Sequence, residues 1–148
     1  MPTAFTDEEM KLIRIKLITA GIRLSRELGI QKMSVEKLSS AVGIAKGSFY
    51  LFFGSKENFI LEMVEYAGAE TQKMLLAKLN GRTQMSAHEF VEFFNEYIHS
   101  ELDLMNGLTV NDFLWLRKHI TKRALFDTGE QLQTARLWLS LIDDVREG

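Results

Sequence analysis

A short stretch of the chain gathers side chains that can hydrogen-bond to phosphate and to base edges. Within five residues it holds Lys46, Gly47, Ser48 and Tyr50, and Lys56 follows one or two helical turns later. Lysine and hydroxyl groups donate hydrogen bonds to phosphate oxygens, and lysine also reaches the acceptor edge of guanine. Because glycine carries no side chain, it lets another backbone approach closely. This combination indicates contact with nucleic acid.

Two short helices are expected to present these side chains. Ser34 is a favourable N-cap, and Met33 and Leu38 on either side of it can form a hydrophobic staple, so the first helix should begin at Val35. Gly43 should end it in the left-handed conformation. The second helix is expected over residues 46–53, with phenylalanines facing the core.

Two helices joined by a tight turn form a helix-turn-helix unit, whose second helix enters the DNA major groove. Lys56 lies at the N-terminus of the following helix, where free amides favour a phosphate. No Arg, Asn or Gln occurs between Lys46 and Phe53, so specificity should rely on apolar contacts and DNA shape. Tyr50 has a second interpretation, as a partly buried core aromatic. The residues predicted to contact DNA are Ser34, Lys46, Gly47, Ser48, Tyr50, Leu51 and Lys56.

The run VGIAKGSFYLFFGSKENF resembles the DNA-binding signature of the TetR family of bacterial transcriptional regulators. In that family a valine-glycine turn leads into a recognition helix, and a serine-lysine-glutamate sequence starts a long helix. The resemblance covers about residues 7–60 and departs at Ala45, where the family usually has Ser or Thr. It implies an all-α fold, a homodimer on a palindromic operator and a repressor that responds to a small-molecule effector. A tilt of the long helix would then move the recognition helix.

Composition favours an ordinary globular chain made almost entirely of helices. The chain has 148 residues, of which 46% are hydrophobic, and contains one proline and no cysteine. Cysteine is therefore unavailable for disulfides, thiolate metal sites or nucleophilic catalysis. No segment resembles a signal peptide, and none approaches the roughly 18 apolar residues of a membrane span. We expect a cytoplasmic protein without a membrane partner.

The net charge of −2 divides unevenly along the chain. Residues 1–60 carry nine Lys or Arg and six Asp or Glu, giving +3, and residues 61–148 carry nine and fourteen, giving −5. A basic end on an acidic chain suits contact with phosphates at one end only, although chance unevenness of a solvated surface gives the same numbers. We predict a DNA-binding head, residues 1–55, and an effector-binding and dimerisation body, residues 56–148.

Helix signals continue on both sides of the central pair. A capping box of Thr6 and Glu9 should start a first helix that Gly29 ends. Beyond it, Ser55 should cap a long helix ending at Asn80-Gly81. Three more helices are expected at the following positions: from Ser86 to about Leu104, from Leu108 to Arg123 or Phe126, and through Leu132 to Ile142.

The body is rich in aromatic side chains and methionine. Residues at helical spacing usually form core, whereas the family resemblance implies an apolar ligand pocket between helices for an unknown effector. The candidate pocket residues are Met63, Tyr66, Phe90, Phe94, Tyr97, Phe113 and Trp115.

The chain is shorter than typical members of the family, which dimerise through two C-terminal helices. It is either truncated, or its last helix provides part of the dimer contact through Leu137, Trp138, Leu141 and Val145. Trp138 alternatively belongs to the intramolecular core.

Three histidines, His88, His99 and His119, lack the spacing of paired metal ligands, and no catalytic constellation occurs. We therefore expect no metal, no cofactor and no enzyme activity. The sequence predicts a ligand-responsive transcriptional regulator. The alternative is a helical protein-interaction module with a vestigial or weak DNA-binding head.

Overall fold

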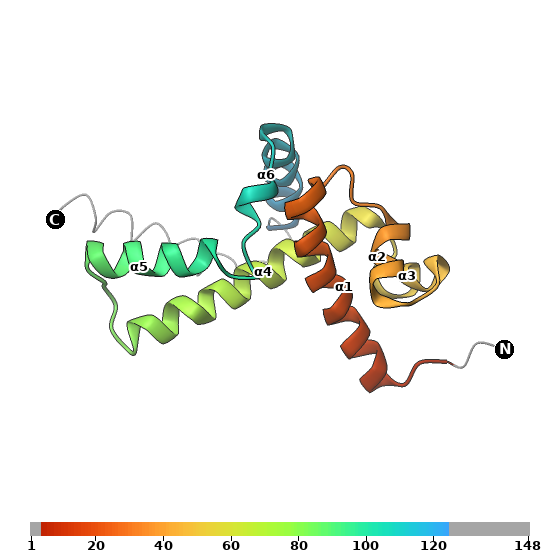
Figure 1. The fold of residues 1–148 in the computed structure, drawn as a ribbon, viewed down its shortest axis with the longest axis horizontal. Coiled ribbons are helices and arrows are strands. Elements are labelled where there is room, and N and C mark those ends of the chain that lie inside the picture. The colour runs from red at the N-terminus through yellow and green to blue at the C-terminus, as the bar shows by residue number, and fades with distance from the viewer. Residues whose placement is uncertain (1–3, 125–148) are drawn as a thin grey trace.

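The computed structural model describes residues 4–124, which form six α-helices and one 3₁₀ helix and include no strand (Figure 1). The all-helical fold predicted from the sequence is confirmed. The elements are α1 (Asp7–Leu28), α2 (Val35–Val42), α3 (Lys46–Phe53), α4 (Lys56–Leu79), α5 (Ala87–Ile98), the 3₁₀ helix η1 (Met105–Gly107) and α6 (Val110–Ala124). The predicted dimer residues Leu137, Trp138, Leu141 and Val145 lie outside the described residues.

Side-chain caps fix the helix starts in the head. The Thr6 hydroxyl accepts a hydrogen bond from the Glu9 amide, and the Glu9 carboxylate accepts one from the Thr6 amide, so the predicted capping box is confirmed. Ser34 caps α2 by accepting from the Lys37 amide at 3.2 Å. Gly43 ends α2 at φ +80°, ψ +31°, the left-handed conformation expected there.

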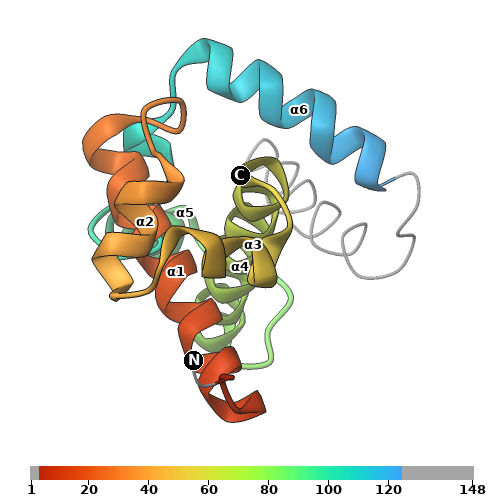
Figure 2. The ribbon, with the colours of Figure 1, turned by 90° about the vertical axis from the view of Figure 1, so that its right-hand side faces the viewer.

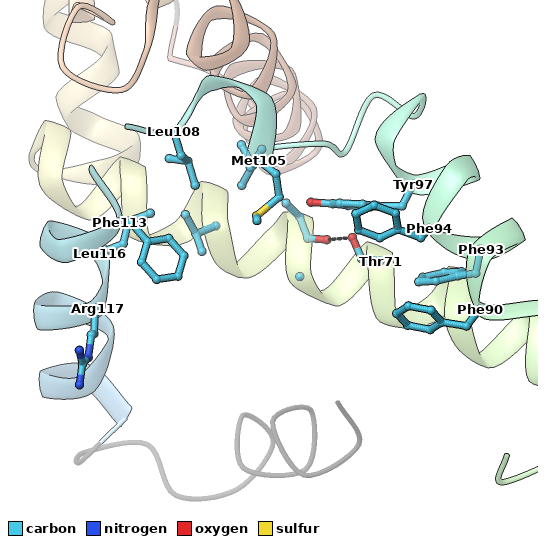
Figure 3. A pocket seen from close by; sticks show the side chains of 14 residues that line it. Thr71, Phe90, Phe93, Phe94, Tyr97, Met105, Leu108, Phe113, Leu116 and Arg117 are labelled. Carbon is cyan, nitrogen blue, oxygen red and sulfur yellow. Dashed lines mark hydrogen bonds between the residues drawn. The ribbon is translucent and has the colours of Figure 1, made fainter. Parts of the chain in front are cut away.

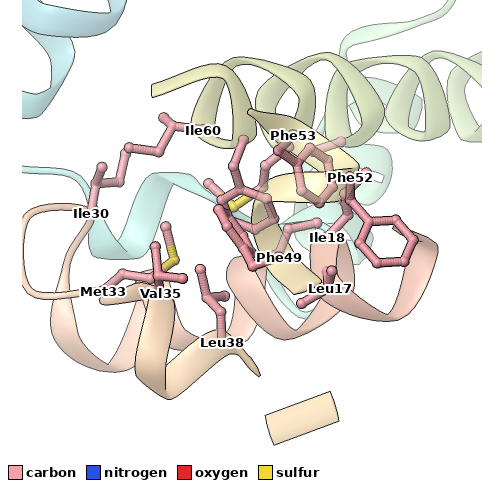
Figure 4. Close-up of a cluster of buried hydrophobic side chains, with 14 of the residues drawn as sticks. Leu17, Ile18, Ile30, Met33, Val35, Leu38, Phe49, Phe52, Phe53 and Ile60 are labelled. Atoms are coloured by element: carbon pink, nitrogen blue, oxygen red, sulfur yellow. The ribbon is translucent and has the colours of Figure 1, made fainter. Parts of the chain in front are cut away.

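The main core lies where α1, α2, α3 and the first half of α4 meet (Figure 4). Phe49 and Phe59 are fully buried, with ring centroids 5.4 Å apart, and Phe53 packs against both. Met33 and Leu38, the two residues of the predicted staple, are also fully buried. Each such side chain contributes about 1.5–3 kcal/mol on burial, so α3 is held firmly by its inner face.

Helix α1 crosses α4 at close range. A Cβ on Gly21 would lie 2.5 Å from Cζ of Phe59, so only glycine fits at the crossing. Nearby, the Arg14 guanidinium donates to the Glu62 carboxylate and, at 2.6 Å, to the Phe52 carbonyl, and it lies 4.6 Å from the Phe53 ring centroid. Arg14 thereby joins the end of α3 to α1 and α4.

The body is built on the second half of α4. This helix ends at Asn80, which takes φ +49°, and α5 then runs back alongside it (Figure 1). Ser86 and Glu89 form the capping box of α5, and Lys78 of α4 donates to Glu96 of α5 at 3.0 Å.

The end of α5 corrects the sequence prediction, which extended this helix to about Leu104. The helix stops at Ile98 because polar groups beyond it bond locally instead. The Ser100 hydroxyl donates to the Tyr97 carbonyl and accepts from the Leu102 amide, and Asp103 accepts from the Met105 amide. Residues 99–104 therefore form a turn.

This turn and η1 lie directly against the C-terminal half of α1. Arg26 donates to the Ser100 carbonyl at 3.0 Å, and a Cβ on Gly107 would lie 2.1 Å from the Ser25 carbonyl oxygen. Helix α6 follows at Val110, two residues later than predicted, because Thr109 caps it by accepting from the Asp112 amide. The body is thus joined to the head at α1 as well as through α4.

Candidate functional site

Helix α3 has one buried face and one exposed face. Its phenylalanines, Phe49, Phe52 and Phe53, point into the core, whereas Lys46, Gly47, Tyr50 and Leu51 are exposed. The exposed set recurs at four-residue spacing, which places it along one side of the helix. Figure 2 views α2 and α3 from the end of the molecule at which they lie.

Large apolar groups on this outer face remain open to solvent. Leu51 is 72% exposed and Tyr50 is 46% exposed, although the Tyr50 ring still packs edge-on against Phe49 at 5.5 Å. A Cβ on Gly47 would meet no atom within 4 Å, so internal packing does not require glycine there. The face therefore combines apolar contact area with room for close approach of another molecule.

The N-terminus of α3 has no side-chain cap. Ala45 occupies the N-cap position and accepts the Ser48 amide through its carbonyl, but it offers no side-chain acceptor. Ser48 itself is half-buried. The first amides of a helix without such an acceptor remain available to an anion, because they have no intrahelical partner.

Lys46 forms an ion pair with Glu36 of α2, and the sequence analysis missed this partner. Both groups are solvent-exposed. The hydrogen bond with Glu36 raises the pKa of Lys46, and the hydrogen bond with Lys46 lowers the pKa of Glu36. The lysine therefore carries its charge at the N-terminal end of α3, held there by an acid ten residues earlier in the chain.

The two remaining predicted DNA contacts flank the loop before α2. The hydroxyl of Ser34 is used as the α2 cap, and the half-buried Lys56 donates to the Gln31 carbonyl at 3.3 Å. These bonds place both residues beside the loop that leads into the helix-turn-helix unit. Their contact with DNA stays a prediction.

Comparison with known proteins supports this arrangement. A family model described as "Bacterial regulatory proteins, tetR family" matches residues 17–63, which span the C-terminal half of α1, all of α2 and α3 and the start of α4. By this match, residues 17–63 are similar to the TetR family. The matched stretch lies largely in the packed helices of the main core.

Individual curated relatives also match part of the chain. From Bacillus subtilis (strain 168), the uncharacterized HTH-type transcriptional regulator YerO is 38% identical over 60 residues, which are 40% of this chain and 21% of YerO. Its counterpart YwcC is 42% identical over 48 residues, covering 32% of this chain and 22% of YwcC. A third relative, YvdT, is 32% identical over 66 residues, which are 45% of this chain and 34% of YvdT.

The similarity covers only part of each relative. Matched segments span about a fifth to a third of the length of these relatives. No solved structure matches the chain significantly. Within residues 4–124, none of the helices combines the length and apolarity needed to cross a membrane.

A second candidate site is a cavity of about 610 Å³ in the body (Figure 3). Four of the seven predicted pocket residues, Phe90, Phe94, Tyr97 and Phe113, line it. The sequence analysis did not select the other lining residues, which are Val64, Ala67, Gly68, Thr71, Phe93, Leu104, Met105, Leu108, Leu116 and Arg117.

Three predicted pocket residues lie elsewhere. Met63 is fully buried in the main core, with its sulfur facing Gly21, and Tyr66 packs against the same core. Trp115 stacks on His119 with ring centroids 4.1 Å apart. Their aromatic or sulfur character suited a pocket, but the direction each side chain takes from its helix excludes it from the lining.

Polar groups in the cavity lining are few. The Thr71 hydroxyl donates to the Ala67 carbonyl at 2.7 Å. Burial raises the pKa of Tyr97, a hydrogen bond with the Leu104 backbone opposes that shift, and the nearby Asp103 adds to it. The Tyr97 hydroxyl consequently stays protonated near neutral pH.

Proposed function

We propose that this chain is a transcriptional regulator of the cytoplasm that binds a palindromic operator as a homodimer and represses until a small molecule binds. In this proposal the head, residues 1–55, binds DNA, and the body, residues 56–148, binds the effector and dimerises. The observation that carries the proposal is the outer face of α3, within the stretch that matches the TetR family model, where Lys46, Tyr50 and Leu51 are exposed.

This face offers the contacts that a major groove requires. Lys46 supplies charge for phosphate or a guanine edge, and Tyr50 supplies a hydroxyl for phosphate. Leu51 is an apolar group suited to a thymine methyl. Gly47 leaves space for the DNA backbone next to them. Affinity would come mainly from phosphate contacts, and sequence preference from apolar contacts and DNA shape.

A homodimer is proposed because helix-turn-helix proteins commonly bind two half-sites about 34 Å, or a multiple of this distance, apart. A single α3 of eight residues covers only one half-site. Sedimentation of the protein with a full palindrome and with a half-site duplex tests this point. Two chains on the palindrome support the proposal, whereas one chain on each duplex contradicts it.

Two connections would carry a ligand response from the cavity to the head. Helix α4 places Met63 in the main core and, one turn on, Ala67 in the cavity lining. Leu104 and Met105 line the cavity directly before Gly107, which lies against the α1 backbone. A ligand that fits only one arrangement of these elements would shift the population toward it and change the placement of α3.

The first experiment is fluorescence anisotropy of a labelled duplex from upstream of the protein's own gene, titrated at several salt concentrations beside a scrambled duplex. We expect preferential binding to the upstream duplex. The logarithm of its association constant should fall linearly with the logarithm of the salt concentration, with a slope of about −0.9 for each neutralised phosphate. The double variant Lys46→Ala/Tyr50→Ala should lose this binding. Lys73→Ala is the matched control, because Lys73 is also an exposed lysine paired with a glutamate, but on the body.

Equal binding to both duplexes, or binding that ignores salt, would contradict operator recognition. If the double variant still binds the duplex, α3 does not contact DNA through Lys46 and Tyr50. The repressor role is tested separately by a reporter placed behind the bound duplex. Its expression should rise when Tyr50→Ala replaces the parent protein, and a fall would indicate activation instead.

A further inference from the structure

Glu36 is an acid in a stretch of chain that otherwise carries only lysines as charged residues. From Ile30 to Lys56 it is the one acidic residue, beside four lysines. A carboxylate close to DNA is repelled by the phosphates, so it lowers affinity for the DNA backbone. Part of its role is local, because a negative charge in the first turn of α2 stabilises that helix. The contact that it makes with α3 has no such local explanation.

Glu36 is joined to the first residue of α3. The Lys46 ammonium donates a hydrogen bond to Oε1 of Glu36, and the side chains of Lys46 and Glu36 remain 54% and 60% exposed. This hydrogen bond lowers the pKa of the Glu36 carboxyl, which is therefore ionised at neutral pH. Tyr50 lies close enough to contribute to the raised pKa of Lys46. A donor and an acceptor thus lie side by side at the N-terminal end of α3, in the neighbourhood of Tyr50.

A bonded donor and acceptor match the edge of a G·C pair better than a phosphate. In the major groove guanine presents two acceptors, N7 and O6, and the N4 amino group of cytosine is a donor beside them. Lys46 has three donor hydrogens and Glu36 has two acceptor oxygens, so each can hold the other and still bond to a base. An A·T pair offers one acceptor next to one donor, and a phosphate offers acceptors only. The G·C edge therefore satisfies most of the groups that the pair presents.

We propose that Glu36 is a specificity-determining residue of the DNA-binding face. Together with Lys46 it reads one G·C pair in each half-site: Lys46 donates to guanine N7 and O6, and Glu36 accepts from the cytosine amino group. This inference rests on the proposed function and names one feature of the operator. Held by Glu36, Lys46 contributes less charge to the binding of unrelated DNA. The pair consequently favours the operator and disfavours other sequences.

Selection from a random-sequence duplex library by the full chain, with sequencing of the bound duplexes, tests the proposal. The parent should select a palindrome with G·C at one position of each half-site. Glu36→Met keeps the length of the side chain but removes the acceptor, so this position should become degenerate. Fluorescence anisotropy then compares the selected duplex with one that carries A·T at that position. The parent should discriminate by roughly tenfold and Glu36→Met by about threefold or less.

Binding to a scrambled duplex provides a second readout, which a purely structural role of Glu36 would not increase. Glu36→Met should strengthen this binding by roughly two- to fivefold at low salt, because Lys46 is released to a phosphate. The salt slope should steepen by up to about 0.9. Glu70→Met is the matched control, because Glu70 is also paired with a lysine, but on the body. It should behave like the parent with every duplex.

A double variant tests whether the two side chains read the same base pair. Lys46→Met should lose the preference for G·C at the same position as Glu36→Met. The double variant Glu36→Met/Lys46→Met should lose no more of it than Lys46→Met alone, since residues that act together are not additive. Additive losses would overturn the shared readout. Circular dichroism verifies that each variant is folded.

The outcomes separate this inference from the proposed function. A parent that selects no palindrome contradicts both. A clear palindrome whose base preferences are unchanged in folded Glu36→Met, or that has A·T at the affected position, overturns the inference alone. Equal weakening of every duplex in Glu36→Met also overturns it, because a residue that only stabilises α2 would give that result.

Discussion

The two halves of α4 differ in what they pack against. In the head half, Phe59 and Met63 are fully buried among side chains of four helices. In the body half, the buried cluster among residues 4–124 has three members, Leu75, Leu79 and Phe93, and the cavity lies between the two clusters. Within that part of the chain, one continuous helix therefore joins a densely packed unit to a more loosely packed one.

The surroundings of two glycines, Gly21 and Gly68, illustrate this difference in packing. A Cβ on Gly21 would collide with the Phe59 ring at 2.5 Å, whereas a Cβ on Gly68 would meet nothing within 4 Å. The first glycine is required by the packing of the protein itself. The second is solvent-exposed, and packing among the described residues does not require glycine there. Among the described residues, the first half of α4 is therefore packed more tightly than the second half.

The largest expected effect comes from truncating a phenylalanine in each half. Phe59→Ala should destabilise the protein by about 3–5 kcal/mol, because it removes a fully buried ring and leaves a cavity. Phe94→Ala should cost far less, since Phe94 is 49% exposed and lines a space that is already open. Urea unfolding measures both changes. Similar losses in the two variants would break the contrast between head and body.

The next effect comes from replacing each of the two glycines by alanine, which should change the stability of the protein in opposite directions. Gly21→Ala should destabilise by about 1–3 kcal/mol, because the added methyl group overpacks the α1–α4 crossing. Gly68→Ala should stabilise by about 0.5–1 kcal/mol, because alanine favours helix and its methyl group meets free space. Thermal unfolding of the two single variants checks the signs. A destabilised Gly68→Ala would mean that the body half is packed after all.

The sequence predicted local features of both halves well. Caps at Thr6, Ser34, Ser55 and Ser86 are short-range hydrogen bonds between residues three apart, so their spacing alone reveals them. The bounds of α2 and α3 follow from such signals and from glycines. The match of residues 17–63 to the TetR family model was also predictable, because several of these constraints coincide at fixed spacing in one short run.

Contacts between helices were not predictable in the same way. The pair of Lys46 with Glu36 and the bond of Arg14 to Glu62 depend on how helices cross and rotate, which periodicity does not specify. The same limit explains why Met63 suited a pocket by its type but faces the core. The end of α5 was missed because a serine in a helical pattern gives no sign that its hydroxyl will bond locally.

A smaller effect should come from the bond that joins the turn after α5 to α1. Arg26→Leu removes the donor to the Ser100 carbonyl and should cost about 1 kcal/mol. Hydrogen exchange should accelerate at the Met105 and Gly107 amides and stay unchanged in α2 and α3. Arg23→Leu is the matched control, because it removes the same group from the exposed side of α1. Faster exchange throughout the head would show instead that Arg26 supports the main core.

The smallest effect concerns the pH dependence of the body and involves Glu89 at the start of α5. Hydrogen bonds from Arg82, and then from the Ser86 amide, hold the pKa of Glu89 at about 2, below its usual value of 4.5. Because the folded-state pKa is depressed, the stabilisation is complete above pH 4.5 and is lost as the pH falls toward 2. Glu89→Gln should therefore be less stable than the parent near neutral pH, and the difference should shrink between these two values. Thermal unfolding across this range measures it, with Glu101→Gln, an exposed glutamate beyond α5, as the control. A difference that stays constant with pH would show that the α5 cap does not depend on the charge of Glu89.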